Sequence, residues 1–115
     1  MGFSLGGTIL PSAARTTSGS VELPFGFGDF DRHAVLINIT AVSGTTPTLD
    51  FFLEDGIDGT LWYPLATTPQ QTAVNALAIR NSNAVASRMR LRWVIGGTTP
   101  SFTFSVQFSG QRDGT

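Results

Sequence analysis

The sequence contains no cysteine and no lysine, and His33 is its only histidine. Without cysteine the chain can form no disulfide, thiolate nucleophile or thiolate metal site, and without lysine it can form no Schiff base. Charged residues make up only 13% of the chain, and the formal net charge is -1. This balance argues against a generally basic nucleic-acid binder, so we expect no nucleic-acid partner. No cofactor is expected either.

Long hydrophobic runs are also missing. In residues 1–10 the apolar positions Phe3, Leu5, Ile9 and Leu10 are interrupted by glycines, and no basic residue precedes them. A secretory signal peptide needs a basic start followed by an uninterrupted apolar run, and a membrane span needs a much longer apolar run. We therefore expect a soluble protein with no membrane partner.

Short β-branched or aromatic runs do recur from Val21 onward, separated by clusters of turn-forming residues. Their spacing near ten residues predicts an all-β fold, a single antiparallel β-sandwich of about seven strands, jelly-roll or immunoglobulin-like. No segment has a helical pattern. Pro64 is expected on an edge strand or at a bulge. The predicted strands span residues 20–25, 33–42, 48–54, 61–67, 71–80, 87–95 and 102–109.

The first residues have a different composition, because Gly, Ser, Thr, Ala and Pro dominate residues 6–20. We therefore divide the chain into an extended N-terminal arm, 1–19, and a β-sandwich domain, 20–115. The arm is expected to dock on a neighbouring molecule or on its own sheet, and a self-packed strand is the alternative. Its candidate partner-contact residues are Phe3, Leu5, Ile9 and Leu10.

One sequence pattern occurs twice. Gly-Thr-Thr-Pro at 44–47 returns 53 residues later at 97–100, each followed by alternating apolar residues. The repeat predicts a duplicated β-hairpin, with each turn ending one strand and starting the next. Upstream of the two segments, the same 53-residue offset matches apolar Val35 with charged Arg88, so the inward-facing positions of the two copies no longer coincide. A one-residue bulge in one copy would restore the match. Independent use of a good turn sequence is the alternative.

Three arginines form the most prominent charge pattern. Arg88, Arg90 and Arg92 alternate with apolar residues, so a strand would place all three on one exposed face. They are candidate partner contacts for phosphates or for carboxylates of a partner, and Asp50 and Glu54 are possible intramolecular partners. We expect no aromatic residue among them, which argues against a platform for single-stranded nucleic acid.

Other potential sites have less support. The acids Glu54, Asp55 and Asp58 lack the alternate-position spacing of a helix-loop-helix calcium site, and Asp58 followed by glycine is typical of a turn. No metal site is therefore expected. For His33 a strand-end or surface position is expected, because no nucleophile motif accompanies it. Catalytic residues are therefore not assigned.

An aromatic pair follows the acids. Trp62 and Tyr63 should point to opposite faces of a strand, one into the core and one to the surface. The exposed ring is a possible sugar platform.

Three segments together resemble a known group of proteins. Residues 43–50, 58–62 and 92–104 look like motifs in small β-rich virion proteins of tailed bacteriophages. The resemblance covers roughly residues 35–110. It implies a virion component without enzymatic activity, made in the host cytoplasm and placed on the capsid surface as a head decoration or cement protein. No site residue is carried over, because the shared motifs are typical of turns and core.

The resemblance also implies partners. These are the major capsid protein or other virion proteins, and further copies of the chain in a homo-oligomer such as a trimer. The first alternative is a carbohydrate- or receptor-binding module of a tail fibre or baseplate, or another head-tail or tail protein. A hydrolase is the second alternative, which the scarcity of catalytic residue types opposes.

Overall fold

The computed structural model describes residues 3–24, 27–83 and 85–112, and all its strands belong to one antiparallel sheet. This confirms the all-β prediction, with six strands in place of seven. The elements are β1 (Phe3–Arg15), β2 (Gly19–Glu22), the short 3-10 helix η1 (Phe27–Asp29), β3 (Arg32–Gly56), β4 (Tyr63–Thr67), β5 (Asn75–Asn81) and β6 (Arg88–Arg112).

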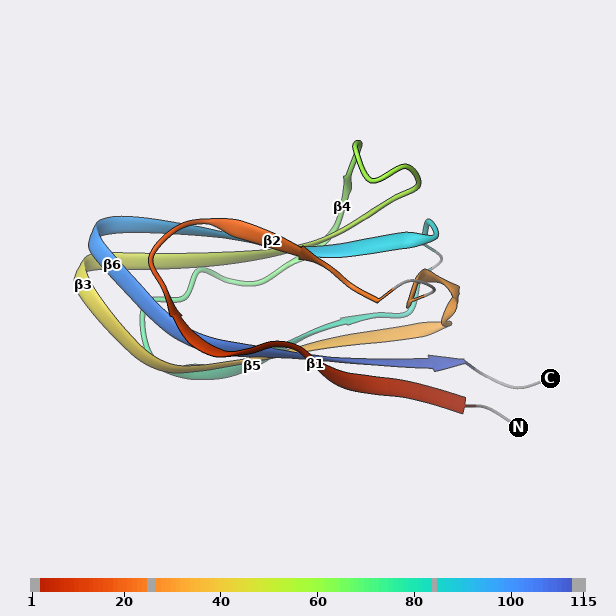
Figure 1. Ribbon diagram of the computed structural model, residues 1–115, viewed down its shortest axis with the longest axis horizontal. Helices are drawn as coiled ribbons and strands as arrows, with labels where there is room; N and C mark the ends of the chain where they lie inside the picture. The colour runs from red at the N-terminus through yellow and green to blue at the C-terminus, as the bar shows by residue number, and fades with distance from the viewer. Residues whose placement is uncertain (1–2, 25–26, 84, 113–115) are drawn as a thin grey trace.

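Two long strands, β3 and β6, form the centre of the sheet and pair with each other from end to end. The other four strands each pair with one of these two. Midway along their length both long strands bend, and the sheet folds back on itself (Figure 1). One half contains β1, β5 and the adjoining parts of β6 and β3. The other half contains β2, β4 and the remaining parts.

The two Gly-Thr-Thr-Pro segments lie at this bend. The sequence prediction of a hairpin turn is wrong here, because each segment is a corner inside one continuous strand. Gly44 and Gly97 have φ angles of +114° and +112°, and Thr46 and Thr99 also have positive φ. A Cβ on Gly44 would lie 2.7 Å from the Thr99 carbonyl oxygen, and one on Gly97 would lie 2.7 Å from that of Thr46. The two corners therefore pack against each other in a symmetric way.

A bulge in β3 explains the parity problem of the repeat. Ile39 pairs with Phe104 but Ala41 pairs with Thr103, so Thr40 is an extra residue. Upstream of Thr40 the matching positions therefore shift by one, and Val35 corresponds to buried Met89 instead of Arg88. The one-residue bulge expected from the sequence is thus present.

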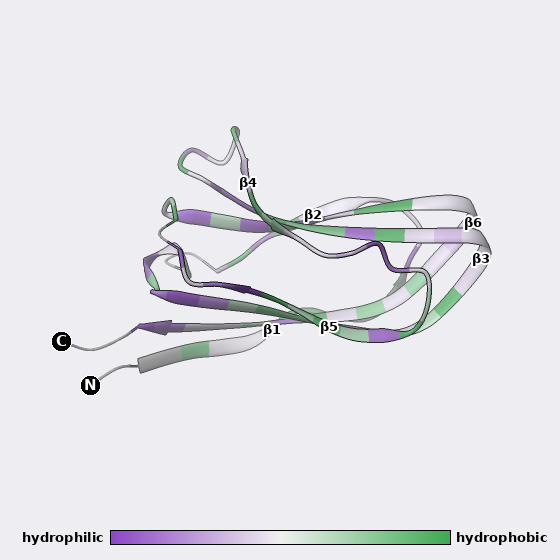
Figure 2. Ribbon diagram, turned by 180° about the vertical axis from the view of Figure 1, so that it is seen from behind, coloured by the Kyte–Doolittle hydropathy of each residue, from purple (hydrophilic) through white to green (hydrophobic). Residues whose placement is uncertain are grey.

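The hydrophobic core lies between the two halves of the folded sheet. Hydrophobic and hydrophilic residues alternate along the long strands (Figure 2), so that one face of each half points inward. Phe104 meets Phe51 at 5.3 Å and Trp93 at 5.7 Å between ring centroids, both edge to face. These contacts join the halves, because Phe104 belongs to one half and the other two rings to the second.

The segment expected to be an arm contains β1, which pairs antiparallel with the last part of β6. Arg15 holds the end of β1 in place: its guanidinium donates to the carbonyl oxygens of Pro11, Ala13 and Phe104 and covers the Phe104 ring. Pro64 lies in β4 at a register shift, as the sequence predicted.

Candidate partner-binding surfaces

Arg88, Arg90 and Arg92, which we call the arginine row, lie on the outer face of β6 as predicted. The alternating residues Met89 and Leu91 are buried in the core. The structure thus brings the three guanidinium groups together on one face, where they are partly exposed.

Carboxylates of the same chain bind all three arginines. Glu54, on the neighbouring strand β3, accepts from Arg90 Nε at 2.7 Å and from Arg92 Nε at 3.2 Å, and it is only 7% exposed. The sequence therefore identified Glu54 correctly as a partner. The other expected partner, Asp50, instead accepts a hydrogen bond from Gln70.

The third arginine has a partner that the sequence did not suggest. Glu22 on β2 forms a bidentate pair with Arg88, at 2.7 Å from Nε and 2.6 Å from Nη2. This hydrogen bonding lowers the pKa of Glu22 and raises that of Arg88. The pairing of β2 with β6 makes this contact, and no local pattern predicts that pairing.

Aromatic rings lie among the arginines, contrary to the sequence expectation. The Arg90 guanidinium is 4.7 Å from the centroid of Trp62, and that of Arg92 is 4.3 Å from the centroid of Phe52. Both rings come from neighbouring segments, so the spacing along β6 alone could not reveal them. Since each guanidinium has a carboxylate partner, and two also have a ring, the row forms a closed network instead of a free phosphate-binding surface.

The loop between β3 and β4, residues 57–62, projects from the body of the protein (Figure 1). Asp58 Oδ1 accepts hydrogen bonds from the backbone N–H groups of Thr60 and Leu61, at 2.9 and 3.0 Å. These bonds lower the pKa of Asp58 and fix the turn that the sequence predicted. Gly59 has a φ of +78° and lies against the Arg88 guanidinium. The loop is therefore tied to the arginine row.

Apolar side chains crowd the surface of this loop and the start of β4. Ile57 is 76% exposed, Leu61 59% and Tyr63 58%. Trp62, which the sequence paired with Tyr63 as core and surface, is half-buried beneath Arg90 and lies outside the core. The loop thus presents a protruding apolar patch, which we call the 57–63 patch.

The acidic residues of this region serve structural contacts. Asp55 Oδ2 accepts a hydrogen bond from the backbone N–H of Ala86 at 2.8 Å, and Glu54 and Asp58 have the partners described above. Among the described residues no group of three or more His, Cys, Asp or Glu side chains could hold a metal ion. Nor does the described part of the chain contain a helix long and apolar enough to cross a membrane.

The candidate contact residues near the N-terminus have different environments. Ile9 and Leu10 are half-buried and pack against the core of their own sheet from β1, whereas Leu5 is 41% exposed. Phe3 is the first residue of β1, and its side chain lies outside the described part of the structure. Of these four residues, Leu5 is the described side chain with most surface available to a partner.

His33 lies at the start of β3, as the strand-end alternative predicted, but it is buried and not on the surface. Its Nε2 lies 3.0 Å from the Phe27 carbonyl oxygen and its Nδ1 lies 3.2 Å from Asn81 Nδ2. This pattern suits a neutral ring with the proton on Nε2, because the carbonyl can only accept and the amide nitrogen can only donate. Burial lowers the pKa of His33 despite these hydrogen bonds.

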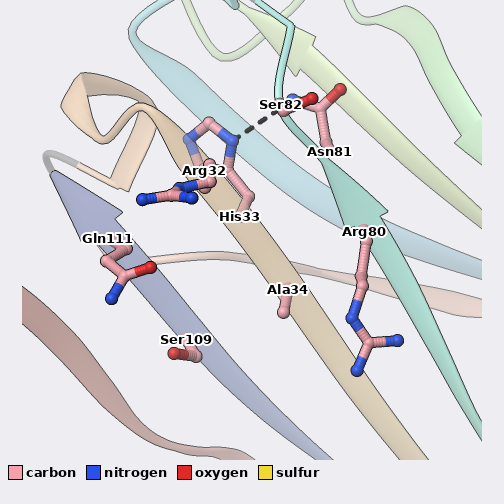
Figure 3. A pocket seen from close by; sticks show the side chains of 8 residues that line it. All are labelled: Arg32, His33, Ala34, Arg80, Asn81, Ser82, Ser109 and Gln111. Carbon is pink, nitrogen blue, oxygen red and sulfur yellow. Dashed lines mark hydrogen bonds between the residues drawn. The ribbon is translucent and has the colours of Figure 1, made fainter. Parts of the chain in front are cut away.

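A groove of about 370 Å³ lies beside His33 where β3 begins. We call it the Arg80 groove. Ala34 pairs with Ser109 of β6 on one side and with Arg80 of β5 on the other. Figure 3 shows that the short Ala34 side chain leaves space between these neighbours. The lining residues are Arg32, His33, Ala34, Arg80, Asn81, Ser82, Ser109 and Gln111.

Comparison with known proteins adds no relative. No protein-family model matches the chain, and a search of curated proteins found no significant match.

Proposed function

We propose that the chain is a non-enzymatic structural protein of a tailed-bacteriophage virion, a two-layer β-sandwich of jelly-roll or immunoglobulin-like type. In this proposal it binds the assembled head as a decoration or cement protein. Its partners are the major capsid protein or other virion proteins, and it acts as a homo-oligomer such as a trimer. The sequence resemblance of residues 35–110 motivates this choice.

The 57–63 patch is the structural observation that best supports a protein-binding role. Ile57, Leu61 and Tyr63 are exposed on or next to a turn in which Asp58 accepts two backbone hydrogen bonds and Gly59 lies against Arg88. Apolar and aromatic side chains on a rigid support bind proteins well, because little conformational freedom is lost on association. The arginine row supports the same role, because its arginines are paired with Glu22 and Glu54 and stabilise the sheet from which the patch projects.

Electron microscopy of virions with and without this protein tests the assignment directly. We expect additional density on the head when the protein is present. Density confined to the tail, or no association with particles, would contradict the decoration role.

The contribution of the patch is tested with the double variant Leu61→Ser, Tyr63→Ser. We expect it to fold normally and to bind heads at least tenfold more weakly in a sedimentation assay, because two apolar anchors are lost. The matched control is Val94→Ser, which removes an apolar side chain that is 37% exposed on β6. Equal binding by both variants would exclude the patch as the contact surface.

Tyr63 also supports a second candidate, a carbohydrate- or receptor-binding module of a tail fibre or baseplate. Its ring is exposed next to a loop that also carries the polar residues Asp58 and Thr60, and an exposed ring beside polar groups can serve as a sugar platform. A glycan array tests this candidate, and binding that is lost in Tyr63→Ala would favour it over the decoration role.

A further inference from the structure

The four outer strands of the sheet differ in how well their free edges are protected. Unpaired strand edges invite pairing with another chain, and proteins block them with short strands, proline, bulges or charges. β1 contains Pro11 and two register shifts, and β4 contains Pro64 and one shift. β2 has only four residues. Three of the four edges therefore carry an obstacle to further pairing.

The remaining edge, that of β5, has no proline, no bulge and more residues than β2, and it carries a single charge, Arg80. Its seven residues pair with β3 without any register shift, and it contains no proline. Ala76 and Ala78 are exposed, so the outer face of the strand is open to solvent at these positions. Every second residue of such a strand turns its N–H and C=O away from its only partner. β5 can thus accept one more strand.

The only charge on β5 is Arg80, and it lies beside the Arg80 groove. Arg80 is exposed and has no ion pair or hydrogen bond within the described part of the protein, unlike the arginine row. Among the groove-lining residues, Ser109 and Gln111 offer further donors and none is acidic. Asp31 lies in the neighbouring hollow, beyond Arg32. The groove is therefore complementary to a carboxylate.

We propose that β5 binds an extended segment of another protein as an additional strand, and that an Asp or Glu side chain of this segment pairs with the Arg80 guanidinium at the border of the Arg80 groove. The new strand would place alternate side chains on the outer face beside Arg80. A guanidinium binds a carboxylate in a bidentate geometry. Hydrogen bonds along the edge would supply affinity, and the carboxylate would fix the register.

A second copy of this chain is a poor occupant. β1, β4 and β5 contain no acidic residue, and Glu22 of β2 is already paired with Arg88. None of the chain's own edges thus carries a free carboxylate. The inference relies on the proposed virion role only for the source of the segment, which would then be a capsid protein.

NMR of the ¹⁵N-labelled full-length protein tests the proposal. The probe is a short peptide of alternating threonine and valine with one central glutamate, and the control peptide has glutamine there. We expect the acidic peptide to shift the β5 amides and to slow hydrogen exchange at every second one of them. Affinity should fall about tenfold for the control peptide and for Arg80→Gln, with part of it retained in Arg80→Lys.

Several outcomes would overturn the proposal. They are absence of binding at millimolar peptide, equal binding of the two peptides, shifts at β1 or β4, and dimerisation through β5 without peptide. Glucuronate binding as tightly as the peptide, without protection of β5 amides, would indicate an acidic-sugar site instead. The virion role fails separately, if purified particles lack the protein. If Arg80→Gln binds heads normally, the edge inference fails and the virion role stands.

Discussion

Glu54 is the residue on which the arginine row depends. It is almost fully buried, and Arg90 and Arg92 each donate a hydrogen bond to one of its oxygens. Removing the carboxylate would leave two neighbouring cations without a carboxylate partner, at a site partly covered by the Phe52 and Trp62 rings. The main role of this network is thus to stabilise the sheet, and ligand binding is secondary.

The variant Glu54→Gln tests this role. We expect it to lower the free energy of unfolding by about 1–3 kcal/mol, because two charge-assisted hydrogen bonds are weakened in a partly buried place. Urea unfolding monitored by tryptophan fluorescence measures the change. The matched control is Glu22→Gln, whose pair with Arg88 is more exposed, and it should have a clearly smaller effect. Equal losses would contradict a special role for Glu54.

His33 should make the stability depend on pH. Burial lowers its pKa in the folded protein below the unfolded value of about 6.5, so the unfolded chain takes up a proton first as pH falls. The stabilising contribution of the neutral ring is therefore complete above that value and is lost progressively below it. Urea unfolding across this range should show a decline that His33→Gln largely removes. An unchanged pH profile in the variant would contradict the assignment.

At the scale of single residues, the sequence predicted correctly the features that depend on the alternation along a strand or on a local turn. Glu54, the shared face of the arginine row and the Asp58 turn were all predicted. Glu22 and Trp62 were missed as partners of the arginines, because β2 and the 57–62 loop reach the row only through the folded sheet. Burial of His33 was missed because η1, which supplies its carbonyl partner, has no signal in the sequence.

At the scale of elements, the bend in β3 and β6 sets the architecture. The sequence indicated a break in regular strand geometry at each Gly-Thr-Thr-Pro segment, and the chain does change direction there. The break was interpreted as a turn between strands, because glycine and proline mark both turns and sharp corners. The contact between the two corners distinguishes these cases, and it exists only in the folded sheet, where Gly44 lies against Thr99 and Gly97 against Thr46.

The corners yield a paired prediction. Gly44→Ala and Gly97→Ala should each lower the free energy of unfolding by at least about 1–2 kcal/mol, because alanine disfavours positive φ and its Cβ would press on backbone atoms. Thermal and urea unfolding should show similar losses for both. Gly7→Ala is the control, since its Cβ would meet only ordinary contacts with the Phe108 ring. A tolerated change at either corner would refute the strained bend.

β1 illustrates what composition alone cannot predict. Its small and polar residues suggested a linker or arm, and strand propensity gave no signal there. Pairing with β6 and the Arg15 contacts to backbone carbonyls nevertheless hold Phe3–Arg15 in the sheet. Tertiary contacts have overridden local preference in this segment.

At the scale of the whole molecule, β3 and β6 are related by an approximate two-fold axis through the corners. β2 leads into β3 and pairs with β6, and β5 leads into β6 and pairs with β3. β4 follows β3 and covers its second part. The equivalent place beside β6 is filled by β1, from the other end of the chain. The two ends of the described chain meet there, since Phe3 pairs with Arg112 (Figure 1).

This arrangement predicts that a circular permutant will fold. Joining residues 1 and 115 with a short glycine linker and opening the chain between Thr16 and Thr17 keeps every described strand intact. We expect native-like amide NMR spectra. Opening between Thr45 and Thr46 instead cuts β3 at its corner, and this control should not fold. Failure of the first permutant would show that β1 must enter the sheet from a free N-terminus.

The pairing of β3 with β6 also determines how the protein reaches its native state. Both halves of the sheet contain parts of the same two strands, and their register joins residues as distant in sequence as Arg32 and Gln111. A large loop must close before β3 and β6 can pair in either half. The entropy of loop closure is therefore lost before most of the stabilising contacts form. We therefore expect slow, single-step folding for a chain of this size, with no half that forms early by itself.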